Sequence, residues 1–94
     1  MTVGLLLVDC FLAGSLSLKD KRHILASVTE RLRRSFNLAV CEVEHQNQWQ
    51  RARVALVLVN TDWRALQSTA AKALEMLERH RELSVLDTEL RRLC

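Results

Sequence analysis

The sequence lacks proline and tyrosine altogether, and its 94 residues include only two glycines, Gly4 and Gly14. So few glycines cannot form a glycine-rich loop of the kind that holds phosphate groups. No apolar run approaches the ~20 residues that a membrane-spanning helix needs, so we expect no membrane partner. Because the chain also has no Pro/Gly-rich linker and is short, it is predicted to form a single domain over residues 1–94.

Cysteine is scarce as well: Cys10, Cys41 and Cys94 form no C-x-x-C motif and are odd in number. Such thiols are typical of a reducing compartment, and we expect the protein to be cytoplasmic. The apolar N-terminal run contains Asp9 and has no basic start, unlike a secretory signal peptide. On a strand, Cys41 and His45 would stand roughly 13 Å apart, too far to share a metal ion. We therefore expect no metal site and no cofactor.

What the sequence has in abundance is aliphatic residues in patterned runs, since 49% of the chain is hydrophobic. Ser17 followed by Asp20 resembles a helix-capping box, and Asn37 suits the end of the same helix. Strands are predicted over 2–12, 38–45, 51–60 and 83–90, and helices over 18–36 and from Thr61 or Asp62 to about Leu77. This β-α-β-β-α-β order predicts a ferredoxin-like α+β sandwich, with a four-stranded antiparallel sheet and two helices on one face.

In that fold the first and third strands are central, and both are apolar on both faces. In the first strand Val3, Leu5 and Leu7 alternate with Leu6, Val8 and Cys10; the third strand has the same character. Continuous apolar strands are typical of sheets covered on both sides. The pattern leaves open which set faces the helices. Either way, we expect a second copy of the chain to cover the open sheet face, giving a homodimer.

The basic residues are concentrated in the first predicted helix. Residues 19–34 hold six basic and two acidic residues, a net charge of +4, whereas the whole chain carries +3. Such a segment attracts phosphate groups, although a solvated helix face has the same appearance. Lys21 is unusual, because helical periodicity places it inside the apolar stripe. Its alternatives are a stem that reaches solvent, an ion pair with a carboxylate such as Asp9, Glu42 or Glu44, and a ligand-binding lysine.

The stretch HQNQWQR, from His45 to Arg51, connects two predicted strands. In one interpretation it is a structural connection in which Trp49 covers the end of the core. In the other it is a recognition loop, whose amides and Arg51 donate hydrogen bonds while Trp49 and His45 stack on a nucleobase or a partner side chain. Both alternatives remain open at this level.

Two stretches, GSLSLKDKR and CEVEHQNQWQRARVALVLVN, resemble the YlxP-like proteins, a bacterial family of unknown function. The family motifs stand here as Ser17 to Arg22 and His45 to Arg51. The resemblance covers nearly the whole chain and implies a ferredoxin-like fold. It also implies a context of translation or the ribosome, because family genes often lie among genes for translation initiation and ribosome maturation. It implies no established activity.

Neither a nucleophile–base pair nor a metal-ligand set is visible, so we expect a protein that is not an enzyme and has no catalytic residues. The first hypothesis is a binding module associated with RNA, the ribosome or translation. The alternative is a homodimeric small-molecule-binding or regulatory domain, with a ligand held where Lys21, His45 and Trp49 converge. The candidate binding residues are Lys19, Lys21, Arg22, His45, Gln46, Trp49, Gln50 and Arg51.

Overall fold

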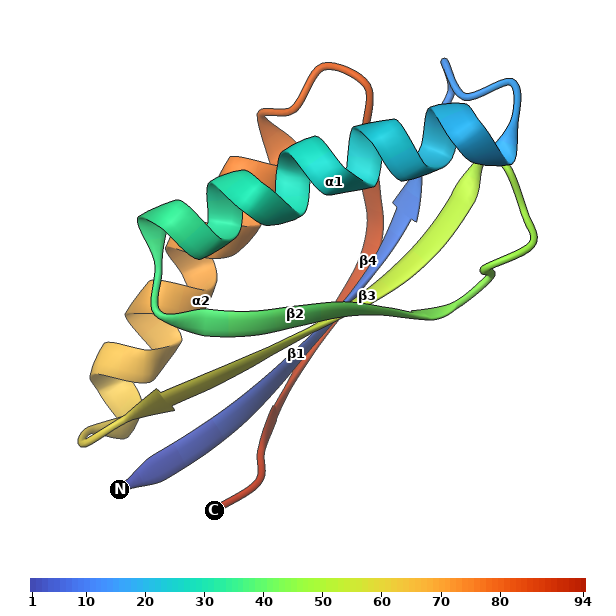
Figure 1. Ribbon diagram of the computed structural model, residues 1–94. Helices are drawn as coiled ribbons and strands as arrows, with labels where there is room; N and C mark the ends of the chain where they lie inside the picture. Colours follow the sequence, from blue (N-terminus) through green and yellow to red (C-terminus); the bar gives the residue numbers. More distant parts are fainter.

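The computed structural model describes residues 1–94 and contains all six predicted elements. They are β1 (Thr2–Phe11), α1 (Leu18–Ser35), β2 (Leu38–Glu44), β3 (Arg51–Asn60), α2 (Trp63–Glu78) and β4 (Ser84–Arg92). The strands form one antiparallel sheet in the order β2-β3-β1-β4, with β1 and β3 central. Both helices lie against the same face of this sheet (Figure 1). The predicted ferredoxin-like arrangement is therefore confirmed.

The two central strands alternate strictly between the helix-covered face and the open face. Leu6, Val8 and Cys10 of β1 point toward the helices and are almost fully buried. In β3 the corresponding positions, among them Val54 and Leu56, are equally buried. The remaining aliphatic side chains of both strands lie on the open face and are partly exposed. The structure thus decides between two sets that the sequence could not distinguish.

Helix α1 begins at the predicted cap and ends close to the predicted residue. The Ser17 hydroxyl accepts a hydrogen bond from the Asp20 N–H, at 3.0 Å. Asp20 returns a bond to the N–H of Leu16 and not to that of Ser17, so the capping box is shifted by one residue. At the other end, Phe36 is extended and its N–H bonds to the Leu32 carbonyl. The helix thus ends just before Asn37, near the predicted position, and Asn37 does not have a positive φ.

Helix α2 starts at Asp62, whose carboxylate accepts the Ala65 N–H, so Asp62 rather than Thr61 is the cap. Near its start, Trp63 packs against the core, and the Arg92 guanidinium lies 5.1 Å from the centre of its ring. Neither α1 nor α2 is long and apolar enough to cross a membrane.

Candidate functional site

The first site residue is Lys21, which the structure places inside the domain with 1% of its side chain exposed. Its Nζ lies 2.6 Å from Glu42 Oε2 and donates a hydrogen bond to the His45 carbonyl at 2.5 Å. Of the three alternatives for Lys21, the structure shows the ion pair with a carboxylate, and that carboxylate belongs to Glu42 of β2. Since its ammonium group is already engaged and shielded, Lys21 positions the β2–β3 loop and does not reach a ligand at the surface.

The β2–β3 loop, residues 45–50, is held at both ends. At its start His45 has a φ of 65°, the left-handed region that a non-glycine residue seldom adopts. The His45 carbonyl accepts the Gln48 N–H at 2.9 Å in addition to Lys21 Nζ. At its end, the Gln50 carbonyl accepts the Leu12 N–H at 2.9 Å, and Gln50 Nε2 donates to the Ala13 carbonyl. These contacts fix the loop to α1 and to the end of β1.

Trp49 is presented outward by this loop, with 55% of its surface exposed. A side chain covering the core would be buried, so the interpretation of Trp49 as a cover is not supported. Instead, Trp49 lines a surface cavity of about 460 Å³, together with Phe11, Asn47, Gln48, Gln50 and Arg51. Phe11 ends β1 and lies directly opposite Arg51, the first residue of β3. We call this the loop-end cavity.

Next to the loop-end cavity, one row of the open sheet face is charged. Asp9 accepts a hydrogen bond from Arg53 at 3.1 Å, and Glu44 lies 3.8 Å from the same guanidinium. The second Asp9 oxygen is buried without a hydrogen-bond partner, 4.0 Å from His45 Nε2. The His45 ring therefore faces Asp9 and does not line the loop-end cavity with Trp49.

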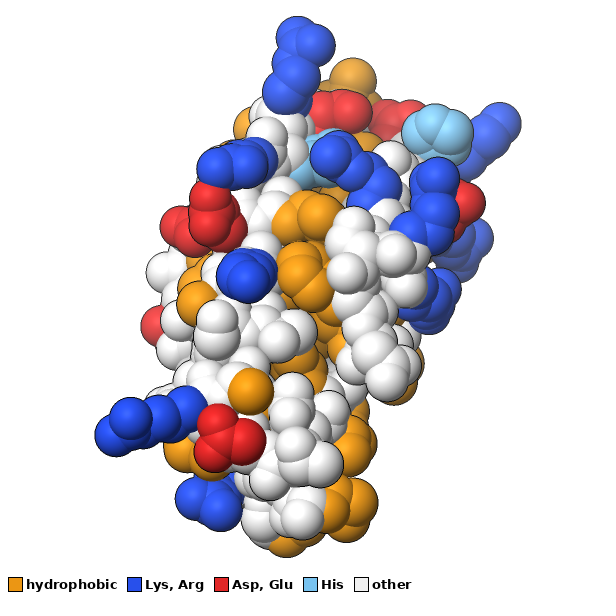
Figure 2. Space-filling view, turned by 90° about the vertical axis from the view of Figure 1, so that its left-hand side faces the viewer, with side chains coloured by type: hydrophobic (Ala, Val, Ile, Leu, Met, Phe, Trp, Pro, Cys, Tyr) orange, Lys and Arg blue, Asp and Glu red, His pale blue; other side chains and the backbone are white.

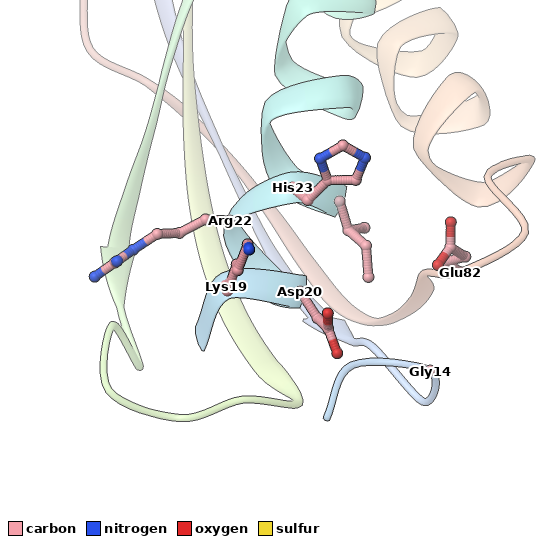
Figure 3. Close-up of a pocket in the computed structure, with 7 residues that line it drawn as sticks. Gly14, Lys19, Asp20, Arg22, His23 and Glu82 are labelled. Carbon is pink, nitrogen blue, oxygen red and sulfur yellow. The ribbon is translucent and has the colours of Figure 1, made fainter. Parts of the chain in front are cut away.

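A second cavity, of about 480 Å³, lies at the first turns of α1 (Figure 3). Gly14, Lys19, Asp20, Arg22, His23, Ile24 and Glu82 line it. Asp20 and Glu82 contribute negative charge beside the basic groups, and Figure 3 shows Arg22 extending away from them toward β2. The interior of this cavity is therefore a poor match for a free anion, because the two carboxylates repel it, whereas Arg22 points away from them.

A third hollow, of about 310 Å³, lies at the opposite end of the molecule, between the end of α1, the end of β3 and the start of α2. Figure 2 looks onto this end and shows hydrophobic side chains along a hollow, with Lys and Arg side chains protruding around its margin. None of the predicted site residues belongs to it.

Among the predicted residues, the structure brings Trp49, Gln50 and Arg51 together in the loop-end cavity and Lys19 and Arg22 in the α1 cavity. Gln46 is exposed and lines neither. Three lining residues, Phe11, Asn47 and Gln48, were not predicted. Asn47 and Gln48 belong to the loop that was singled out, and the long-range pairing of β1 with β3 is what brings Phe11 to it.

No group of three or more His, Cys, Asp and Glu side chains is placed to hold a metal ion. Among the thiols, Cys10 is buried, whereas Cys41 and Cys94 are exposed. Burial, together with the smaller effect of the charge of the neighbouring Asp9, raises the pKa of the Cys10 thiol to about 12. Cys10 is therefore protonated at neutral pH and is a core residue rather than a nucleophile.

The fold and the loop-end cavity define the protein as a ferredoxin-like α+β domain with an exposed aromatic loop. Residues 3–90 match the family described as "Protein of unknown function (DUF503)", and the chain belongs to that family. Over 59 residues it is 29% identical to "Uncharacterized protein YlxP" of Bacillus subtilis (strain 168). That match spans 63% of this chain and 64% of the Bacillus protein. The YlxP-like resemblance is thus confirmed, and both descriptions leave the function open.

Proposed function

We propose that the protein is a non-enzymatic, cytoplasmic binding module for RNA, acting at or near the ribosome. The observation that carries this proposal is the charge of α1. After Lys21 is set aside as buried and paired, the helix still exposes five basic side chains and only two acidic ones, Asp20 and Glu30. The exposed basic residues are Lys19, Arg22, Arg31, Arg33 and Arg34.

These groups are available to phosphates to different degrees. Arg34 is 3.5 Å from Glu30 in an exposed pair, and Arg33 donates to the Val40 carbonyl of β2 at 3.2 Å. Lys19 and Arg22 make no such pair, and they lie on the turn of α1 whose Lys21 holds the β2–β3 loop. A nucleic acid contacting this end of α1 would thus reach the loop as well. Phosphate contacts of this kind supply most of the sequence-independent affinity of RNA-binding proteins.

A salt-titrated binding assay tests the proposal. Fluorescence anisotropy with a labelled single-stranded RNA of mixed sequence should give an affinity that falls steeply as salt rises. Replacing Lys19 and Arg22 by Gln should reduce the slope of log K against log salt by about 1.4, since each phosphate contact contributes roughly 0.7 for single strands. Absence of association at low salt would overturn the proposal.

The matched control removes two exposed basic residues from α2, Arg64 and Lys72, again by replacement with Gln. The net charge changes equally in both variants. We therefore expect the control to retain nearly the full slope of the unmodified protein. Equal losses in the two variants would mean that binding depends on overall charge alone, and would contradict a binding surface on α1.

We further propose that the protein acts as a homodimer through its open sheet face. On this face Val3, Leu5 and Leu7 of β1 lie beside Ala55, Val57 and Val59 of β3. Val59 is 52% exposed, and the other five are partly exposed. Contiguous aliphatic side chains in this setting are typical of interaction surfaces.

A small-molecule-binding function is the alternative. Cavities of about 460 and 480 Å³ are within the range of ligand pockets, roughly 300–1,000 Å³. The lining of the α1 cavity disfavours a small-molecule-binding function, because ligand pockets are predominantly apolar. Only Ile24 among the seven residues that line this cavity is hydrophobic. The proposed convergence of Lys21, His45 and Trp49 also lacks support, since Lys21 is buried and His45 faces Asp9.

A further inference from the structure

The loop-end cavity has a composition unlike that of the other hollows of the molecule. Two of its six lining residues are aromatic, three are amides and one is Arg51; none is acidic. Phe11 and Arg51 come from the ends of adjacent strands, and the other four residues come from the loop between β2 and β3. Such a set is suited to a planar, polar-edged ligand with a negative charge nearby.

The two aromatic side chains supply surfaces for stacking. Trp49 is a large hydrophobic group that is 55% exposed, and Phe11 is partly exposed on the open face. Exposed aromatic side chains on loops and strand ends are the platforms on which proteins stack unpaired bases. Because every base has a π-face, this contribution depends little on sequence.

The polar side chains of the loop-end cavity supply the complementary edge contacts. Asn47 and Gln48 carry both donors and acceptors, as do the edges of the bases. Arg51 Nε is buried and has no hydrogen-bond partner within the protein. Because Nε is closed to a ligand, an acceptor would contact the outer guanidinium nitrogens of Arg51, which is partly exposed and lines the cavity.

The loop that presents Trp49 is already in place before any ligand arrives. Lys21 and the Gln48 N–H hold the His45 carbonyl, and Gln50 bonds to Leu12 and Ala13. Binding therefore does not have to order the loop, which lowers the entropic cost of association. Lys21 acts here as a positioning residue.

We propose that the loop-end cavity binds one unpaired nucleobase of single-stranded RNA, stacked on Trp49 with Phe11 beside it and Arg51 contacting the base edge or an adjoining phosphate. This inference rests on the proposed RNA-binding function and assigns to this cavity the part that recognises a base. The basic side chains of α1 then contact the phosphates of the flanking nucleotides.

The test compares two labelled RNA oligomers of equal length, one with normal bases and one in which stable abasic residues replace the central bases. Both carry the same phosphates. We expect the unmodified protein to bind the oligomer with bases about 10-fold more tightly, in keeping with the stacking contribution. Trp49→Ala should abolish that difference, and Trp49→Phe should restore most of it.

A second readout reports on the indole directly. The chain has two tryptophans, so a Trp63→Phe variant leaves Trp49 as the single indole. Stacking of a base should quench its fluorescence on addition of the normal oligomer but not of the abasic one. Because Trp49 is exposed, Trp49→Ala should unfold at nearly the same temperature as the unmodified protein, and circular dichroism checks this.

The outcomes separate the two proposals. If neither oligomer binds at low salt, RNA binding itself is wrong. If both bind equally and Trp49→Ala changes nothing, RNA binding stands and the base-binding cavity is overturned. A preference for the normal oligomer that survives Trp49→Ala would place base recognition elsewhere and would equally overturn the assignment.

Discussion

At the scale of single residues, Lys21 explains the geometry of the candidate site. Its ammonium group joins Glu42 of β2 to the carbonyl of His45, and so connects α1 with the start of the loop. The sequence indicated this role, because a lysine inside an apolar stripe needs a partner. It did not indicate the hydrogen bond to the His45 carbonyl, because every residue has a backbone carbonyl and a sequence pattern does not distinguish one from another.

Replacing Lys21 by Met should lower the free energy of unfolding by about 3 kcal/mol, because Glu42, only 24% exposed, and the His45 carbonyl both lose their donor. Urea denaturation measures the change. A Lys21→Met/Glu42→Leu double variant should recover part of the loss, since no unpaired carboxylate remains. The control is Arg34→Met, which removes an exposed pair with Glu30 and should cost less than about 1 kcal/mol. Similar losses in the two single variants would show that Lys21 is not a structural anchor.

At the scale of helices and strands, a glycine of β1 leaves the space that side chains of α2 occupy. A Cβ atom at Gly4 would lie 2.6 Å from Leu66 Cδ2 and 3.4 Å from the Trp63 ring. Leu66 is 1% exposed, so it has little room to move. Gly4 is thus a packing residue of the helix–sheet interface. At Gly14, by contrast, the nearest atom would be Glu82 Oε2 at 3.9 Å.

Gly4→Ala should therefore destabilise the protein by about 1–3 kcal/mol, the usual cost of overpacking a core. For a domain of this size each kcal/mol corresponds to roughly 4–8 °C in Tm, so thermal denaturation resolves the effect. Gly14→Ala is the matched control; its φ is not positive and space is available, so it should be neutral or slightly stabilising. A Gly4→Ala protein as stable as the Gly14→Ala protein would show that α2 adjusts without cost.

The order and type of the elements could be predicted from the sequence because periodicity records which positions are buried. Two features could not. The side of β1 that meets the helices was undetermined, since Val3, Leu5 and Leu7 are as apolar as the buried set. The membership of Phe11 in the loop-end cavity depends on its pairing opposite Arg51, forty positions later in the chain, and local patterns do not encode such a register.

At the scale of the whole molecule, the open sheet face is divided into zones. The strand register places the aliphatic pairs Val3–Val59, Leu5–Val57 and Leu7–Ala55 in successive rows. The next row pairs Asp9 with Arg53, and the last pairs Phe11 with Arg51 at the loop-end cavity. A charged row thus separates the aliphatic zone from the loop-end cavity. A partner copy of the chain can therefore cover the aliphatic zone while the loop-end cavity stays open.

Charges on β4 border the same aliphatic zone. Arg91 lies opposite Leu5, Glu89 opposite Leu7, and the two charged side chains pair with each other. The hydrogen bond from Arg91 holds the pKa of Glu89 below its usual range. A polar border of this kind around an apolar centre is typical of interfaces between proteins.

The homodimer itself can be tested by placing one charge in the aliphatic zone. Six aliphatic side chains from each of two copies, at about 1 kcal/mol each for the part still exposed, give a gain of about 12 kcal/mol. This gain is comparable to an association cost of ~4–15 kcal/mol. Leu5→Lys, at the centre of this zone, should therefore convert a dimer into a monomer of 10.8 kDa in light scattering at micromolar concentration. Its fold should persist, because Leu5 is already partly exposed.

Leu16→Lys, at a leucine 71% exposed outside the sheet, is the control and should stay dimeric. An unmodified protein of monomer mass would contradict the dimer outright.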